Sequence, residues 1–260
     1  MKQIQFETPE FTSCKHGIVA MKEIGIFGGT FNPMHIRELQ VAQFAIEQFA
    51  LAKVIFVPNG TPPHKKTDVL DRESRYEMVL AAIKDNPLFE ASRVEIDRPG
   101  VTWTIDTLKE LKTLLGDEIR LNFICGEDVI DNLARYDRRS EFLGLVRLLV
   151  CPRTSEDIVK ALASWKETLP DADIELIDCP VSGMSSTLVR KWIRAGKSIK
   201  YVVHPAVLEV VERKGHYKVI ELPPAPSLAE TSQSEVKEAP KKARSKKRSK
   251  TKALPKTDVA

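Results

Sequence analysis

The stretch GIFGGTFNPMHIREL, residues 25–39, contains an apolar strand, a loop with two glycines and the start of a helix. Gly28 and Gly29 let the backbone approach a ligand closely, because no side chain stands in the way. The helix start offers free N–H groups and a positive dipole end, and His35 adds a further donor there. This arrangement predicts an anion site, although a tight turn between a strand and a helix explains the two glycines equally well.

Apolar segments of strand length and amphipathic segments of helix length alternate along the rest of the chain. This alternation predicts an α/β fold with a Rossmann-like, mostly parallel sheet and helices on both faces. In such sheets, ligands bind at the carboxyl ends of the strands. The expected strands are residues 22–28, 53–60, 92–97, 120–126, 145–153 and 173–179. The expected helices are residues 38–51, 72–85, 104–116, 157–169 and 185–196.

The composition of the 260 residues, 42% hydrophobic and 29% charged, is typical of a globular protein. No run of 18 apolar residues occurs, and the first 20 residues hold two glutamates and no hydrophobic block of the signal-peptide kind. We therefore expect a cytoplasmic protein without membrane contact. The cysteines form no Cys-x-x-Cys pair, so they predict reduced thiols and no metal site. They are Cys14, Cys125, Cys151 and Cys179.

Charge is distributed unevenly between the body of the chain and its end. Residues 1–220 carry 30 Lys and Arg against 31 Asp and Glu, whereas residues 221–260 carry 10 against 5. The second range is rich in Pro, Ser, Ala and Lys and buries too little apolar surface to offset chain entropy, so we expect a disordered tail. Its eight basic residues at 241–252 have two interpretations: a solvated extension with weak contact to nucleic acid, or a functional segment that binds RNA or DNA through salt-dependent phosphate neutralisation.

A second helix start carries polar groups suited to an anion. The segment GMSSTLVR, residues 183–190, opens a helix with Ser185, Ser186 and Thr187 and places Arg190 one turn later. Hydroxyl groups, free N–H groups and a guanidinium at one helix start can hold a phosphate. A helix cap beside a surface arginine explains the same segment and is the simpler interpretation of it taken alone.

Six motifs follow one another along the chain: GGTFNPMH (28–35), VPNGTPPHK (57–65), RPGVTWTIDTL (98–108), FICGEDVIDNL (123–133), SSTLVR (185–190) and GKSIKYVVHPAVLEVVERKGHY (196–217). In these motifs and in their order the chain resembles bacterial nicotinate mononucleotide adenylyltransferases, members of the nucleotidyltransferase superfamily of HxGH type. The likeness runs from about Met21 to Tyr217. Residues 21–220 are therefore interpreted as the nucleotidyltransferase domain, and residues 1–20 as an extension or a misassigned start.

The resemblance implies transfer of the adenylyl group of ATP to nicotinate mononucleotide in NAD biosynthesis, giving deamido-NAD and pyrophosphate. ATP and nicotinate mononucleotide are the partners it implies, and Mg²⁺ is expected to accompany the triphosphate. The phosphate of the mononucleotide attacks the α-phosphorus of ATP, and because this nucleophile is already an anion, no general base is needed. Catalysis then rests on positioning and on charge stabilisation around the phosphates.

The resemblance also implies roles for single residues, by their position in the motifs. The expected catalytic residues are His35 and Arg190. The expected ATP-binding residues are Gly28, Gly29, Thr30, Phe31, Ser185, Ser186, Thr187 and Arg190. The expected mononucleotide-binding residues are Lys65, Thr102, Trp103, Thr104, Gly126, Asp128 and Tyr136. In this last set Trp103 and Tyr136 are expected on opposite sides of the nicotinate ring, although core or surface aromatics fit the same positions.

The chain departs from the family pattern directly after His35. The family has a glycine and a second histidine where this chain has Arg37 and Glu38. If Glu38 takes the place of that histidine, the lost phosphate donor costs roughly 3–4 kcal/mol. A carboxylate about 4 Å from a phosphate adds about 4 kcal/mol of repulsion at an effective dielectric near 20. Two hypotheses avoid this cost: Glu38 ligates a magnesium ion that bridges to the phosphates, or Arg37 supplies the missing charge.

The departure leaves a second function open, that of a catalytically weakened nucleotide-binding relative with a sensing or scaffolding role. Against it, the motifs at 57–65, 98–108 and 185–190 keep polar groups that a purely structural descendant would not need. An adenylyltransferase acting on phosphopantetheine fits less well, because the Thr-Trp-Thr loop and Tyr136 suit a flat aromatic ring. Two departures are milder: Asn32 stands where the family usually has aspartate, and Tyr136 where it usually has tryptophan.

Overall fold

The computed structural model describes residues 22–61, 68–152 and 158–218. The chain divides into one unit of residues 1–219 and another of residues 220–260, and the second unit lies wholly outside the described ranges. The domain boundaries and the assignments expected for residues 1–20 and for the tail therefore stay predictions. Lys65 also lies outside the described residues.

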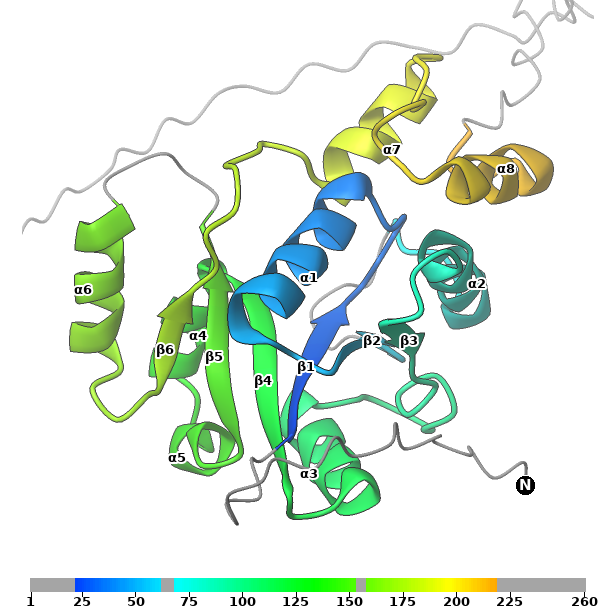
Figure 1. Ribbon diagram of the computed structural model, residues 1–260. Coiled ribbons are helices and arrows are strands. Elements are labelled where there is room, and N and C mark those ends of the chain that lie inside the picture. Colours follow the sequence, from blue (N-terminus) through cyan, green and yellow to red (C-terminus); the bar gives the residue numbers. More distant parts are fainter. Residues whose placement is uncertain (1–21, 62–67, 153–157, 219–260) are drawn as a thin grey trace, which may run out of the picture. The chain divides into compact units, whose positions relative to one another are not determined.

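The described residues form a six-stranded parallel sheet in the order β3-β2-β1-β4-β5-β6 (Figure 1). β1 pairs with both β2 and β4, so the strand order reverses beside β1, which is where doubly wound sheets open a crevice for ligands. The predicted α/β, Rossmann-like fold is confirmed. The strands are β1 (Lys22–Gly29), β2 (Lys53–Pro58), β3 (Phe89–Ala91), β4 (Ile119–Gly126), β5 (Val146–Cys151) and β6 (Ile174–Leu176).

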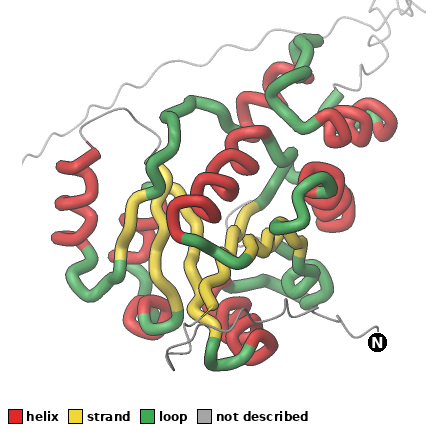
Figure 2. The backbone as a smooth tube through the Cα atoms, in the orientation of Figure 1, coloured by secondary structure: helices red, strands yellow, loops and turns green. Residues whose placement is uncertain are grey.

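Helices lie on both faces of this sheet (Figure 2). Those expected from the sequence are present with shifted ends, and α4, α5 and α8 are additional. α4 and α5 have 7 and 5 residues, which is too short to display a helical period in the sequence. The helices are α1 (Ile36–Phe49), α2 (Arg72–Ile83), α3 (Thr104–Leu115), α4 (Asp128–Ala134), α5 (Arg139–Leu143), α6 (Ile158–Thr168), α7 (Ser186–Arg194) and α8 (Pro205–Lys214).

The central strands are apolar on both faces because each face supports its own core. Successive residues of a strand point to opposite sides of the sheet. In β2, Val54 and Phe56 belong to the core shared with α1, α2, α7 and α8. Ile55 and Val57 belong to the core shared with α3, α4, α5 and α6. A strand buried on both sides appears in the sequence as an unbroken apolar run, which is why β1, β2, β4 and β5 were predictable.

One predicted strand, at residues 92–97, is wrong. β3 ends at Ala91, and the chain then turns away from the sheet edge. The turn buries the carboxylate of Glu95, whose oxygens accept hydrogen bonds from the Thr107 hydroxyl at 2.9 Å and from the Gly60 N–H at 3.3 Å. The alternating apolar pattern in this segment reflects a turn packed on the core and not a strand.

Candidate active site

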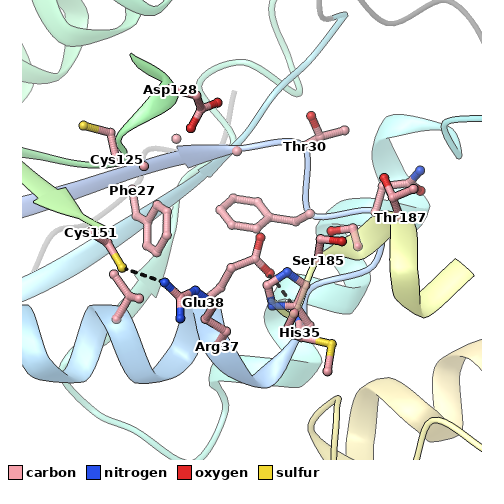
Figure 3. A pocket seen from close by; sticks show the side chains of 18 of the residues that line it. Phe27, Thr30, His35, Arg37, Glu38, Cys125, Asp128, Cys151, Ser185 and Thr187 are labelled. Atoms are coloured by element: carbon pink, nitrogen blue, oxygen red, sulfur yellow. Dashed lines mark hydrogen bonds and ion pairs between the residues drawn. The ribbon is translucent and has the colours of Figure 1, made fainter. Parts of the chain in front are cut away.

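A cavity of about 770 Å³ lies at the carboxyl ends of β1, β4 and β5 and at the amino ends of α1 and α7 (Figure 3). Its volume is within the range of sites that bind small molecules and cofactors. Figure 3 places Asp128 and Thr187 on opposite sides of it. The residues expected at the site that line the cavity are Gly28, Gly29, Thr30, Phe31, His35, Gly126, Asp128, Ser185, Ser186, Thr187 and Arg190.

The end of β1 forms the floor of the cavity, and its second glycine has a packing role. A Cβ atom on Gly29 would lie 2.8 to 3.1 Å from the ring of Phe31, whereas one on Gly28 would lie 3.5 Å from Phe123. Phe31 is 1% exposed, and its ring meets those of Phe27 and Phe56 edge-on. The absence of a side chain at Gly29 thus leaves room for the Phe31 ring beneath the loop. It also lets a ligand approach the backbone closely.

The start of α1 presents a buried histidine to the cavity. His35 is the N-cap residue and is 6% exposed. Its Nδ1 atom forms no hydrogen bond with the described residues and lies 3.5 Å from a carboxylate oxygen of Glu38. The backbone N–H of His35 donates to that same oxygen at 2.8 Å. Glu38 therefore caps the helix, in the manner of the acidic residue of a capping box.

Arg37 leaves the same helix turn in a different direction. Its guanidinium donates to the carbonyls of Pro152, at 2.6 Å, and Pro180, at 3.0 Å, and to the sulfur of Cys151, at 3.2 Å. The side chain is 8% exposed and has no carboxylate partner among the described residues. Arg37 thus ties α1 to the segments that follow β5 and β6, and it leaves a buried positive charge in the cavity wall (Figure 3).

Two serine hydroxyls at the start of α7 form hydrogen bonds that fix the position of this helix. The Ser185 hydroxyl accepts a hydrogen bond from the Leu188 N–H at 3.2 Å, so the simpler interpretation of this residue as a helix cap is confirmed. The Ser186 hydroxyl donates to the Pro33 carbonyl at 2.9 Å, which holds the two helix starts beside each other. Both positive helix ends thereby open on one cavity.

Arg190 is held in place across the same junction. It donates to the Asn32 carbonyl at 2.8 Å and to the Asp68 carboxylate at 2.9 Å. Asp68 also accepts a hydrogen bond from Arg194, and these two arginines hold the pKa of its carboxyl below the usual range, Arg194 having the larger effect. An incoming phosphate would compete with Asp68 for the guanidinium of Arg190.

The expected mononucleotide-binding residues divide into two groups. Gly126 and Asp128 line the cavity, at the end of β4 and the start of α4. Thr102, Trp103, Thr104 and Tyr136 are not among the described residues that line it. Thr102 is buried with its hydroxyl unpartnered within the described ranges, and Trp103, the N-cap residue of α3, is 45% exposed. Tyr136 is half-buried against the core beneath α4.

Sequence reasoning missed one buried residue that shapes the site. Arg75 is 1% exposed, and its guanidinium donates to the carbonyls of Thr30 at 3.0 Å, Gly60 at 2.9 Å and Leu70 at 3.0 Å. It therefore joins the loops that follow β1 and β2. A signal was present, because a charged residue occupies the helical stripe whose other members are buried and apolar: Met78, Val79 and Ala82.

No group of three or more His, Cys, Asp or Glu side chains that could hold a metal ion occurs within the described ranges. None of the helices in those ranges is long and apolar enough to cross a membrane.

Comparisons with known proteins match this chain over the region that contains the cavity. A family model described as cytidylyltransferase-like matches residues 26–192. A "Probable nicotinate-nucleotide adenylyltransferase" of Caldicellulosiruptor bescii is 41% identical over 202 residues, covering 75% of this chain and 99% of the relative. One of the same description from Desulfitobacterium hafniense is 38% identical and covers 76% of this chain and 97% of the relative. The chain belongs to the nicotinate-nucleotide adenylyltransferase family.

A solved structure resembles this chain in fold. Nicotinic acid mononucleotide adenylyltransferase of Plasmodium falciparum, complexed with NaAD, superposes with a TM-score of 0.63 at 20% identity. The alignment covers 75% of this chain and 97% of that one. At this identity the match supports the arrangement of strands and helices and leaves the roles of single residues to the geometry of the site.

Proposed function

We propose that this chain transfers the adenylyl group of ATP to nicotinate mononucleotide, producing deamido-NAD and pyrophosphate for NAD biosynthesis. The observation that carries the proposal is that two helix amino ends, those of α1 and α7, open on one cavity at the reversal point of a parallel sheet. Two phosphate-bearing substrates can meet there, each near a positive helix end. The family relatives are described as nicotinate-nucleotide adenylyltransferases, which supports the same reaction.

The α1 and α7 side of the cavity is the proposed site of the triphosphate. His35 is buried, and its Nδ1 atom forms no hydrogen bond with the described residues and lies 3.5 Å from the Glu38 carboxylate, so a phosphate oxygen would supply a hydrogen bond that the ring lacks. Ser185, Ser186 and Thr187 surround the first turn of α7, and Arg190 brings the guanidinium. Gly28, Gly29, Thr30 and Phe31 would then line the crevice between the two substrates.

The β4 and α4 side is the proposed site of the mononucleotide. Gly126 permits close approach, and the carboxylate of Asp128 can accept hydrogen bonds from ribose hydroxyls. Thr102, Trp103, Thr104 and Tyr136 would form the ring subsite beyond the cavity, with Lys65 near the phosphate. The exposed indole of Trp103 is consistent with a surface that a ligand covers.

Catalysis in this proposal requires positioning and charge stabilisation, because the attacking phosphate oxygen is already ionised. The Mg²⁺ ion enters with ATP as part of the substrate, held mainly by phosphate oxygens. Glu38 and Asp128 are carboxylates in the cavity wall that could complete its coordination. His35 and Arg190 would stabilise the charge that develops on the departing pyrophosphate.

The alternative of a catalytically weakened nucleotide-binding relative is not favoured, since the relatives named above are described as enzymes over nearly their full length. Its support came from Glu38, and in the structure this carboxylate accepts a hydrogen bond from the backbone of His35. The helix cap turns the acid toward the start of α1 and gives it a stabilising contact that the expected repulsion did not include.

Pyrophosphate release tests the proposal. Purified protein is supplied with ATP, Mg²⁺ and either nicotinate or nicotinamide mononucleotide, and Glu38→His is assayed alongside. We expect turnover that is faster with the nicotinate compound and requires both substrates. Silence of the natural chain with both mononucleotides, together with activity of Glu38→His, would reject the proposal in favour of the binding role.

Two further expectations belong to the proposal. We place the reaction in the cytoplasm, where the reduced cysteines expected from the sequence are stable. The basic residues at 241–252, outside the described ranges, are proposed to contact nucleic acid weakly. Binding of the full chain to RNA that disappears between low and physiological salt would agree with this; binding unchanged by salt would contradict it.

A further inference from the structure

Two free cysteines are in contact beside the cavity, and one of them, Cys151, lines its wall. The sulfur atoms of Cys151 and Cys179 are 3.1 Å apart, although 28 residues separate them in sequence. Cys151 is the last residue of β5, and Cys179 lies three residues beyond the end of β6. A disulfide bond is about 2.05 Å long, so a shift of about 1 Å would join the sulfurs.

The surroundings of this pair favour a thiolate. The guanidinium of Arg37 donates to the Cys151 sulfur at 3.2 Å and has no carboxylate partner within the described ranges. The hydrogen bond from the Cys151 thiol lowers the pKa of Cys179, and the charge of Arg37 lowers it further. The pair therefore holds one proton between two sulfurs more readily than two isolated thiols would.

Cys125 provides the contrast within the same cavity. It also lines the wall, and burial raises the pKa of its thiol, with a further contribution from the charge of Asp128. The contrast lies in the partners of the sulfur and not in this shift, because the hydrogen bond to Cys179 and burial raise the pKa of the Cys151 thiol as well. Among the described cysteines, only Cys151 and Cys179 combine a sulfur partner with a neighbouring cation. Cys151 lines the open cavity, so a small solute can reach it.

We propose that Cys151 and Cys179 are a redox-active dithiol, a modification site that hydrogen peroxide converts to an intramolecular disulfide. The proton that the pair shares passes to Cys179, the Cys151 thiolate at the cavity wall attacks one peroxide oxygen, the O–O bond breaks, and the products are a sulfenic acid and hydroxide. The second sulfur then attacks the sulfenic sulfur, the S–O bond breaks, and water leaves after taking up a proton. In sum, two thiols are oxidised to one disulfide while one peroxide is reduced to two waters.

The disulfide alters the nucleotide side of the cavity, a consequence that rests on the proposed function. It fixes the end of β5 to the segment that runs from Cys179 into the start of α7. That segment leads to Ser185, Ser186 and Arg190 of the proposed phosphate site, so a bond at Cys179 limits how the start of α7 can adjust to a triphosphate. The oxidised chain should therefore bind ATP less tightly than the reduced chain.

Mass spectrometry tests the bond without reference to activity. The full chain carrying Cys14→Ser, which removes the cysteine outside the described ranges, is treated with an equimolar amount of hydrogen peroxide. We expect an intact mass lower by two hydrogen atoms and a tryptic cross-link between LLVCPR (148–153) and the peptide of residues 167–190. A reductant should reverse both. Over-oxidised single cysteines or untouched thiols at these positions would overturn the proposal.

Kinetics tests the consequence. For the oxidised chain we expect an apparent KM for ATP about tenfold higher, the effect of losing roughly one charge-assisted hydrogen bond. Cys179→Ser, whose side chain is outside the cavity lining, should keep the reduced chain's activity and resist peroxide, and Cys125→Ala should remain peroxide-sensitive. A cross-link without a kinetic effect would reject only the link to ATP. A chain inactive in both states would reject the proposed function and leave the dithiol intact.

Discussion

Replacement of Arg75 by methionine should be among the most destabilising single changes in the described part of the chain. The side chain is 1% exposed and donates to three backbone carbonyls, at 2.9 to 3.0 Å. Methionine fills much of the volume but leaves these carbonyls without their donor. Burial also lowers the pKa of the guanidinium, so part of the gain from its hydrogen bonds is offset by desolvation.

The net loss should be about 3–5 kcal/mol, because three buried carbonyls each lose a donor at about 1–3 kcal/mol, and part of this is offset by the desolvation of the guanidinium that is no longer required. That is a large part of the 5–15 kcal/mol by which domains are typically stable, and it corresponds to a fall in Tm of roughly 10 °C. Urea unfolding of the full chain, followed by tryptophan fluorescence, measures it. Arg72→Met is the matched control on the same helix, because Arg72 is exposed and donates to one carbonyl at 3.2 Å.

A loss below about 1 kcal/mol for Arg75→Met, similar to that of an ordinary surface change, would refute the reasoning. It would mean that the loops carrying Thr30 and Gly60 find other donors when the guanidinium is absent. Arg72→Met should stay within about 0.5 kcal/mol of the natural chain.

Three further predictions concern Gly60, Arg190 and Asp68. Gly60→Ala should lower stability by about 1–3 kcal/mol in thermal unfolding, because its Cβ would lie 2.1 Å from the Glu95 carbonyl oxygen; an unchanged Tm would contradict this. Arg190→Met should reduce kcat/KM for pyrophosphate release about 10²-fold or more, and a change below threefold would exclude a role at the phosphates. The pKa of Asp68 is lowered chiefly by the hydrogen bond from Arg194, so its stabilisation is complete above the unfolded pKa of about 3.9 and is lost as the pH falls through the lower folded value. When the free energy of unfolding is measured against pH, it should fall less steeply at acid pH for Asp68→Asn than for the natural chain. Parallel curves for the two proteins would contradict this prediction.

The fold was predictable because most of its strands are buried on both faces. β1, β2, β4 and β5 appear as apolar runs between amphipathic segments, and each run needs two covering layers, which only a parallel sheet with helices on both sides supplies. The segment at 92–97 misled because Val94 and Ile96 alternate with polar residues as in a strand. The buried carboxylate of Glu95 excludes a strand there. Its hydrogen-bond partners, Gly60 and Thr107, are distant in sequence.

The cavity was predictable in outline for a related reason. The motifs at 28–35 and 185–190 each predict the start of a helix. Parallel sheets place such helix starts at the edge where the strands have their carboxyl ends. The partners of individual side chains were not predictable, because they depend on contacts across the fold. Arg190 meets Asp68 and Asn32, which lie 122 and 158 residues away in the chain.

Glu38 shows that a motif can predict the position of a residue without predicting its hydrogen-bond partner. The motif comparison put this residue in the place of the family's second histidine, and the structure makes it the third residue of α1, where a side chain reaches back toward the N-cap. In that place a histidine would direct a donor into the phosphate side of the cavity, and a glutamate instead accepts the backbone N–H of His35. The acid thus uses a donor that a phosphate at the helix start would otherwise contact. If ATP binds there, either the carboxylate shares a Mg²⁺ ion with the phosphates or it turns away and gives up a cap of about 1 kcal/mol, a smaller cost than the repulsion expected from the sequence alone.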